Sequence, residues 1–313
     1  MIPSHQKLYA ALKLTDNDIA SVIEGGLFNE VHRVIRSEEH FYIKSFADEA
    51  KTPGFPPLPT TALQRYQVAV DLHENAQKVV TGKVYVPQLL AADPANRAIA
   101  MEGAKGINLY EYIVNNETFH FAVDQISQVL AWLSSLHTLE NSNILAISSN
   151  SDAFKYYKAA LQYRAIFELL FKKNLEGANA FVNEHLTLQA TLLHGDLNSR
   201  NIIICEDGRI AVIDFEQGQV GCGSHDVAYL ISEIIIASFV VNEEIEALTN
   251  LLWSHYETNA TNIDKYKRFR RHLGFQVLYR LKGPSRHIWT GHLNGDIKAK
   301  IETWCKRELC SRL

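Results

Sequence analysis

The chain has 313 residues, enough for two lobes that each bury a core of their own. Hydrophobic residues make up 47% of it and charged residues 21%, which excludes a disordered or fibrous chain. The formal net charge of -4 gives no electrostatic reason to expect a nucleic-acid partner. The N-terminus lacks the basic start and apolar run of a signal peptide, so we expect a cytoplasmic protein that binds neither nucleic acid nor a membrane.

The first hundred residues predict an antiparallel meander, with strands at 20–24, 30–36 and 41–46. Half of the eight prolines then fall between residues 53 and 59, where they exclude both a strand ladder and a helix. Thr60 or Thr61 can cap a helix that runs to about Lys78. Two further strands are expected after this helix, at 84–86 and 97–102.

After residue 106 the pattern becomes helical, since apolar residues recur with a helical period between Phe119 and Leu136. We expect a loop at 140–151 and a long helix from Asp152 to about Asn174. Four helical segments should follow from His225 to the C-terminus, with breaks at Asn242, near Asn259 and at Gly283-Pro284. The chain thus predicts an α+β fold of two lobes. We expect residues 1–103 to form a β-rich lobe and residues 104–313 to form a larger α-helical lobe.

The cysteines and histidines give no metal-binding pattern. Cys205, Cys222, Cys305 and Cys310 form no C-x-x-C pair, and no histidine follows them at zinc-finger spacing. The thirteen histidines are scattered along the chain. We therefore expect free thiols and no structural zinc.

Two β-branched runs between Asn201 and Asp214 flank Asp207 and Gly208, which is a strong hairpin pattern. If those two residues are the centre of the turn, residues equally distant from it face one another, and Asn201 lies opposite Asp214. Directly opposed residues have Cβ atoms about 4.5 to 5.5 Å apart. Amide and carboxylate oxygens at that spacing suit Mg²⁺, so we expect both residues to bind magnesium.

Asp196 lies five residues before Asn201, on a loop that begins at His194 and Gly195. This places a carboxylate near the metal, where it can accept the proton of an attacking hydroxyl group. Alternatively, Asp196 caps a turn, Asn201 satisfies loop carbonyls and Asp214 ends a strand, since each arrangement is common singly. All three residues at this spacing favour the catalytic interpretation.

The motif HGDLNSRN at 194–201, followed by IDFE at 213–216, resembles the aminoglycoside phosphotransferase and choline kinase superfamily, which is related to the protein kinases. The resemblance implies a protein-kinase-like bilobal fold, with ATP and Mg²⁺ as cofactors. It also implies phosphoryl transfer to a hydroxyl group.

The same resemblance assigns roles to single residues. Asp196 is expected to be the catalytic aspartate, with Asn201 and Asp214 as the magnesium ligands. His194 supports the site from the loop. Asp226 matches the aspartate that holds the catalytic loop in this family.

The N-terminal lobe resembles the family too. Gly25, Gly26 and Asn29 match its glycine loop, whose backbone approaches phosphates, although a plain hairpin turn is the alternative. Lys44 is flanked by apolar residues in a predicted strand, where a charge needs a partner or a ligand. It matches the third-strand lysine that holds the α- and β-phosphates.

Two further parts of the nucleotide site are assigned by position. The partner of the strand lysine is expected to be Glu74, and if Gln67 takes that place the usual ion pair is absent. The strand that ends at residue 102 resembles the hinge between the lobes. Backbone groups of Glu102 and Ala104 are expected to bind adenine, with Met101 just before them at the pocket.

The acceptor is expected to be a small molecule. Only eleven residues separate Asp214 from Asp226 and no Ala-Pro-Glu follows, which leaves no room for a peptide-docking segment. A sugar, an amino alcohol and an aminoglycoside-like drug stay open, in that order, and the protein can be a monomer or a homodimer. The rival interpretations are an atypical protein serine/threonine kinase and a nucleotide-binding protein without catalysis.

Side chains in the C-terminal lobe suggest each kind of acceptor without deciding among them. An aminoglycoside asks for carboxylates, and choline asks for aromatic rings. A basic segment at 265–286 can suit an anionic or neutral sugar, or can be a solvated helix face. The candidate acidic residues are Glu216, Glu233, Glu243, Glu244 and Glu246, and the candidate aromatic residues are Tyr229, Trp253, Tyr256, Tyr279 and Trp289.

Overall fold

The computed structural model describes residues 6–15, 18–23, 28–49, 51, 57–139, 145–171, 175–188, 191–257 and 262–310. Its strands are β1 (Ile19–Ile23), β2 (Glu30–Arg36), β3 (Glu39–Ser45), β4 (Val84–Tyr85), β5 (Leu89–Asp93), β6 (Ala98–Glu102), β7 (Gly106–Asn108), β8 (Thr191–Leu193), β9 (Ile202–Cys205), β10 (Ile210–Val212) and β11 (Gln219–Gly221).

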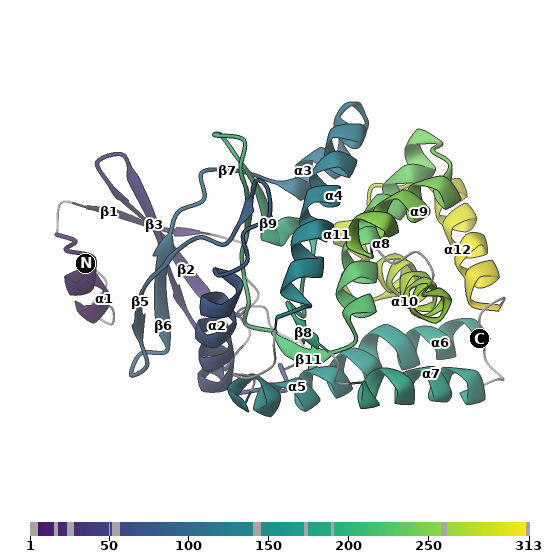
Figure 1. Ribbon diagram of the computed structural model, residues 1–313, viewed down its shortest axis with the longest axis horizontal. Coiled ribbons are helices and arrows are strands. Elements are labelled where there is room, and N and C mark those ends of the chain that lie inside the picture. The colour runs from purple at the N-terminus through teal and green to yellow at the C-terminus, as the bar shows by residue number, and fades with distance from the viewer. Residues whose placement is uncertain are drawn as a thin grey trace.

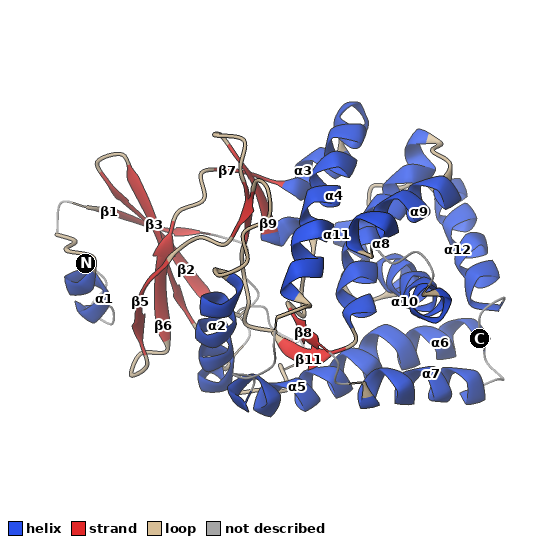
Figure 2. Ribbon diagram, viewed as in Figure 1, coloured by secondary structure: helices blue, strands red, loops and turns tan. Residues whose placement is uncertain are grey.

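The helices of the first half are α1 (Gln6–Ala11), α2 (Ala62–Ala76), α3 (Leu109–Val114), α4 (Phe119–Leu136), α5 (Leu145–Lys158), α6 (Ala165–Phe171) and α7 (Leu175–Thr187). Those of the second half are α8 (Gly223–Val241), α9 (Ile245–Tyr256), α10 (Ile263–Lys282), α11 (Arg286–Trp289) and α12 (Gly295–Cys310). Strands gather at one end of the molecule and helices at the other, so the α+β fold is confirmed (Figures 1 and 2).

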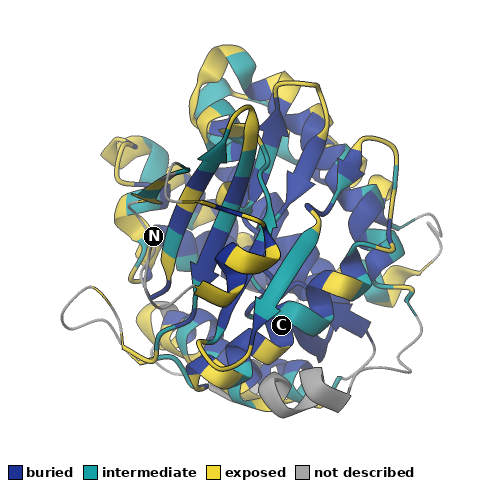
Figure 3. Ribbon diagram, turned by 90° about the vertical axis from the view of Figure 1, so that its left-hand side faces the viewer, coloured by how far each residue is buried: buried dark blue, intermediate teal, exposed yellow. Residues whose placement is uncertain are grey.

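An antiparallel five-stranded sheet in the order β1-β2-β3-β6-β5 forms the N-terminal part. The sheet carries both buried and exposed residues (Figure 3). Buried residues alternate with more exposed ones in β2, whereas Ala98, Ile99 and Ala100 of β6 are all buried. Leu8 and Tyr9 of α1 belong to one apolar cluster of this sheet, and Tyr66 and Ala69 of α2 belong to another. β5 was not predicted, because Leu-Leu-Ala-Ala-Asp lacks the β-branched residues that favour strands.

A second sheet, in the order β4-β10-β9-β7, carries the predicted hairpin. β4 pairs in parallel with β10, more than a hundred residues later in the chain. The strand expected at 84–86 therefore belongs to the sheet of the hairpin and not to the five-stranded sheet. The division of the chain at residues 103 and 104 stays a prediction.

The expected long helices form, with different limits. Thr61 caps α2 and shares a capping box with Gln64. α5 begins at Leu145, so the loop expected up to residue 151 ends earlier, and residues 140–144 lie outside the described ranges. The predicted helix to Asn174 is divided, since a π-helical segment at Ala159–Arg164 separates α5 from α6.

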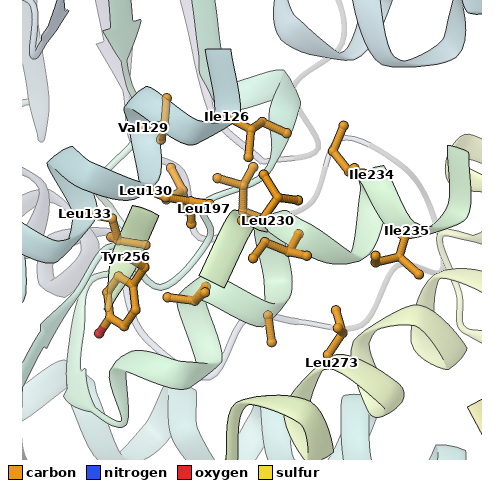
Figure 4. Close-up of a cluster of buried hydrophobic side chains, with 14 of the residues drawn as sticks. Ile126, Val129, Leu130, Leu133, Leu197, Leu230, Ile234, Ile235, Tyr256 and Leu273 are labelled. Carbon is orange, nitrogen blue, oxygen red and sulfur yellow. The ribbon is translucent and has the colours of Figure 1, made fainter. Parts of the chain in front are cut away.

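The C-terminal helices pack around α8, which is buried along most of its length. Its side chains meet those of α4, α9 and α10 in the main core (Figure 4). Leu197, between the site residues Asp196 and Asn198, is fully buried in this core and anchors the predicted catalytic loop. By length and composition α8 can cross a membrane. However, 78% of its apolar stretch is buried inside the protein, as in a core helix.

Five helices follow the catalytic segment in the described part of the chain, where four were expected. The additional one is the short α11. α8 ends at Asn242, which adopts a left-handed conformation with a φ of 59°. Gly283 caps the end of α10. The breaks expected at Asn242 and at Gly283 are therefore confirmed, while residues 258–261 lie outside the described ranges.

Candidate active site

A cavity of about 630 Å³ lies where the five-stranded sheet and α2 meet the catalytic segment. Lys44 lines it from β3, Asp196 and Asn201 from the loop after β8, and Asp214 from the end of the hairpin. These four residues span most of the chain in sequence. Their convergence on one cavity places the predicted nucleotide and catalytic residues together.

The hairpin forms, but its predicted register is wrong by one residue. Ile202, Ile203 and Ile204 pair with Val212, Ala211 and Ile210, and Ile213 donates its N–H to the carbonyl oxygen of Asn201. The turn has three residues, with Gly208 at a φ of +82°, which is the geometry of a turn followed by a bulge. Asn201 therefore lies opposite Ile213, and Asp214 lies just beyond the ladder.

Asp214 reaches the cavity because the chain bends sharply there. Its φ is +71°. This value lies in the left-handed region, which residues other than glycine, asparagine and aspartate rarely adopt. The Nδ2 atom of Asn201 donates to the Asp196 carbonyl at 2.9 Å. Its Oδ1 atom accepts no hydrogen bond within the described part of the chain. The oxygens of Asn201 and Asp214 thus fit Mg²⁺, which prefers oxygen ligands.

Asp226 holds the catalytic loop, as the resemblance implied. Its carboxylate accepts the backbone N–H of His194 at 2.7 Å and that of Gly195 at 3.1 Å. A Cβ on Gly195 would collide with the carbonyl oxygen of Gln217, and the φ of Gly195 is +83°. The loop therefore requires glycine at this position.

His194 is fully buried beneath the catalytic loop, on the side of the hairpin. Its Nε2 atom lies 3.0 Å from the Ile213 carbonyl oxygen and must donate to it, while Nδ1 accepts the N–H of Asp196 at 3.3 Å. Burial lowers the pKa of His194 despite the nearby charge of Asp226. A neutral imidazole thus joins the catalytic loop to the hairpin. His194 does not line the cavity, so its expected place among the catalytic residues becomes a positioning role.

Asp196 faces the cavity with about a fifth of its side chain exposed (22%). Burial raises its pKa to about 6, and the charge of Lys158 opposes this rise. A carboxylate with that pKa is a stronger base than an ordinary aspartate and is still largely ionised at neutral pH. The side chain is placed to accept a proton from a hydroxyl group that enters the cavity.

Lys44 forms an ion pair across the cavity. Its Nζ atom lies 2.6 Å from Oδ1 of Asp214 and 3.6 Å from Oε2 of Glu216. Burial opposes the charge of Lys44, but the two carboxylates outweigh it and raise the pKa of the lysine. Burial likewise acts to raise the pKa of Asp214, and Lys44 outweighs it and lowers that pKa. Lys44 and Asp214 are therefore charged before any nucleotide binds, whereas burial raises the pKa of Glu216.

Glu216 takes the place in which Glu74 was expected. It accepts a hydrogen bond from Asn29 at 2.7 Å and lies 3.8 Å from the buried Arg65 of α2. Glu74 is exposed on α2 and does not line the cavity, so the prediction that it pairs with Lys44 is wrong. The helix turns Arg65 toward the site instead, and Gln67 is exposed as well.

The remaining nucleotide residues are only partly described. Gly25 and Gly26 lie outside the described residues. Met101, Glu102 and Ala104 all line the cavity at the end of β6. The N–H of Glu102 is already donated to the Gln88 carbonyl at 2.8 Å. The N–H of Ala104 has no acceptor within the described ranges, so of these two backbone N–H groups only that of Ala104 can serve adenine.

Three histidines that are far apart in sequence meet outside this cavity. The side chains of His185, His225 and His272 are buried, and their possible ligand atoms lie within 4.8 Å of one another. The hydroxyl group of Tyr163 lies 2.7 Å from Nδ1 of His225 and 2.8 Å from Nδ1 of His272. Sequence patterns did not indicate this cluster, because its histidines come from α7, α8 and α10.

The charges around the histidine cluster do not favour a cation. Burial, together with the charges of Lys155 and Lys158, lowers the pKa of His185 to about 3. Two ammonium groups that keep an imidazole neutral also repel a metal ion. We therefore interpret the cluster as a neutral part of the core, in which Tyr163 contacts His225 and His272, while the ring nitrogens of His185 have no hydrogen-bond partner among the described residues. Cys205, Cys222 and Cys305 are free thiols, as expected, while the side chain of Cys310 is outside the described set.

The two lobes, the central cavity and the aspartate-bearing loop define a kinase-like phosphotransferase fold. The model of the phosphotransferase enzyme family matches residues 21–259, and the chain belongs to that family. No curated protein sequence matches the chain.

Solved structures of small-molecule kinases share the fold. The ethanolamine kinase of Plasmodium vivax has a TM-score of 0.57 and 14% identity, over 99% of this chain and 87% of the kinase. The choline kinase LicA of Streptococcus pneumoniae has a TM-score of 0.52 and 16% identity, over 98% and 97% of the two chains. The complex of APH(2'')-IIa with streptomycin and ATP has a TM-score of 0.51 and 14% identity, over 97% and 95%.

Proposed function

We propose that the protein is an ATP- and Mg²⁺-dependent kinase that transfers the γ-phosphoryl group to a hydroxyl group of a small molecule. The observation that carries the proposal is the convergence of Lys44, Asp196, Asn201 and Asp214 on one cavity. Lys44 would bind phosphate oxygens of ATP, while Asn201 and Asp214 would hold Mg²⁺. The ion supplies charge stabilisation for the phosphates when it is bound.

The acceptor would lie beside Asp196, where the carboxylate takes the proton of its hydroxyl group. Tyr157, Tyr229, Tyr279 and Trp289 line this side of the cavity. Such a wall suits the apolar faces of a sugar ring or of another flat, hydroxylated compound. This supports the sugar as the first choice among the acceptors.

A polycationic acceptor finds few free carboxylates here. The acidic residues considered from sequence are already engaged: Glu216 with Lys44, Glu233 with Arg280, Glu243 with His120 and Glu246 with Arg270, while Glu244 caps α9. They therefore form no open acidic cluster. This disfavours aminoglycosides.

A quaternary ammonium acceptor is disfavoured by the aromatic residues. The guanidinium of Arg280 lies 4.1 Å from the centre of the Tyr229 ring and 4.9 Å from that of Trp289. A ligand cation would have to compete with this charge. Trp253 packs against Phe269 in the core instead of lining the cavity. Arg268, Arg270 and Arg280 of the basic segment also form internal ion pairs, so they do not make up an open anion site.

We further propose that the protein acts in the cytoplasm, as a monomer or homodimer, without nucleic-acid or membrane partners. An ATP-consumption screen against sugars, amino alcohols and aminoglycosides tests the reaction. We expect ATP loss with a hydroxylated, uncharged compound. If labelled ATP in a cell lysate instead marks protein alone, the chain is a protein kinase of this fold, and if no ATP binds, the proposal fails.

A further inference from the structure

Lys158 is a buried lysine beside the catalytic loop that the sequence did not single out. It is the last residue of α5, directly before the π-helical segment, and only 3% of it is exposed. Its Nζ atom donates to the Gly195 carbonyl and lies 4.0 Å from Oδ1 of Asp196. It lines the same cavity as the proposed phosphate and magnesium residues.

The charge of Lys158 is poorly compensated in comparison with that of Lys44. Lys44 has carboxylate oxygens at 2.6 and 3.6 Å, whereas the only ion pair of Lys158 within the described residues is the one at 4.0 Å. An ammonium has three N–H donors, and one of these is bonded to the Gly195 carbonyl. The centre of the Tyr229 ring lies 5.5 Å from Nζ and compensates part of the charge. Two donors still form no hydrogen bond within the described residues, and burying them without a ligand costs free energy.

The ammonium group of Lys158 lies beside Asp196, where the negatively charged phosphoryl group would meet the acceptor in the proposed reaction. In the proposed transfer, the acceptor oxygen forms a bond to the γ-phosphorus, the bond from that phosphorus to the β-phosphate oxygen breaks, and the hydroxyl proton goes to Asp196. ADP leaves with the electron pair of the broken bond. A hydroxyl bonded to Asp196 is within reach of Lys158 as well, and so are the phosphoryl oxygens that approach it.

We propose that Lys158 is a catalytic residue whose ammonium contacts the phosphoryl group as it is transferred. This inference rests on the proposed kinase function. A fixed cation that is itself buried, as Lys158 is, stabilises such charge without reorganising during the reaction. The π-helical segment that follows shifts the helical register, and such segments are frequent at functional sites.

The same helix offers a matched control. Lys155 lies one turn before Lys158, is also buried, and donates to the Leu188 carbonyl at 3.1 Å, but it does not line the cavity. Burial lowers the pKa of both lysines. A loss that came merely from removing a buried lysine would appear in Lys155→Met as much as in Lys158→Met.

The test compares Lys158→Met, Lys158→Arg, Lys155→Met and the wild type with water as the acceptor, so that no acceptor has to be known. Mg-ATP hydrolysis gives the rate, and titration calorimetry gives the affinities for ATP, for ADP, and for ADP with aluminium fluoride as a mimic of the transferring phosphoryl group. We expect Lys158→Met to lower hydrolysis and the affinity for the fluoride complex by about 100-fold. The affinity for ADP alone should stay within about twofold, Lys158→Arg should recover part of the rate, and Lys155→Met should resemble the wild type.

The possible results distinguish the role of Lys158 from the proposed kinase function. If the wild type binds ATP and hydrolyses it, and Lys158→Met does so at the same rate, Lys158 is not catalytic although the kinase function stands. An equal loss in Lys155→Met, or an equal loss of ADP affinity in Lys158→Met, would assign a structural role instead. A wild type that binds no ATP would overturn the kinase function and this inference together.

Discussion

Nζ of Lys44 lies 2.6 Å from Oδ1 of Asp214, although 170 residues separate the two in sequence. The pair joins the central strand of the five-stranded sheet to the end of the hairpin. A buried ion pair of this kind is strongly affected when one partner is removed, because the other charge stays behind. When Mg-ATP binds, each partner can exchange the other for a ligand: Lys44 can bind a phosphate group, and Asp214 can bind the cation.

Asp214→Asn and Asn201→Ala should weaken nucleotide binding only when Mg²⁺ is present, because both residues supply oxygens to the ion in the site that we propose. We expect at least a tenfold loss of Mg-ATP affinity, since charged hydrogen-bonding partners are worth about 1.5 to 3 kcal/mol. Titration calorimetry of ATP with Mg²⁺ and with EDTA measures this difference. Equal losses in both solutions would show that these residues do not act through the metal.

Asp196→Asn should lower phosphoryl transfer by about 10² to 10⁴, the usual contribution of a general base, and leave Mg-ATP affinity near the wild type. Product formation with the best acceptor of the screen measures the rate. Asp207→Asn is the control, since Asp207 is exposed at the turn of the β9–β10 hairpin, away from the cavity residues. Unchanged turnover in Asp196→Asn would remove this residue from the role of base.

Glu216→Gln should weaken Mg-ATP binding, whereas Glu74→Gln should not. Glu216 contacts Lys44 and Asn29, so its loss removes one of the two carboxylates beside Lys44 and the acceptor of the Asn29 amide. The expected change is about 1 to 3 kcal/mol in binding. Glu74 is exposed on α2, and its substitution should change stability and binding by less than about 0.5 kcal/mol. The opposite ranking would restore Glu74 as the functional partner of Lys44.

The histidine cluster should make the fold sensitive to acid. His185 has a pKa lowered to about 3 by burial, and His225 and His272 and the charges of Lys155 and Lys158 surround it. The unfolded chain binds a proton below about pH 6.5 while the folded state does not, so the free energy of unfolding falls as the pH decreases. The slope approaches about 1.4 kcal/mol per pH unit for each such group.

Urea unfolding between pH 7.5 and 5 measures this slope. His185→Phe should reduce it, since the variant has no proton to take up on unfolding at that position. His255→Asn is the control, because His255 is exposed on α9. A slope that is identical in His185→Phe and the wild type would mean that His185 is protonated in the folded state.

Local pattern was enough for much of the fold. The meander, the cap at Thr61, the helix from Phe119 to Leu136 and the end of α8 at Asn242 follow from residues close together in sequence. The hairpin was predicted for the same reason. Its register was not, because a single extra turn residue moves every pair by one, and Asp207-Gly208 is compatible with both turns.

The sequence by itself determined the motif around Asp196 and the family to which this motif points. Asp196, Asn201 and Asp214 are close in sequence, so one loop and one hairpin are enough to bring them together. The tertiary structure alone decided the partners that come from elsewhere: Glu216 in place of Glu74, Lys158 beside Asp196, and three distant histidines in one cluster. Each depends on which face of a helix packs inward. That choice is made by the whole core, so no local pattern can predict it.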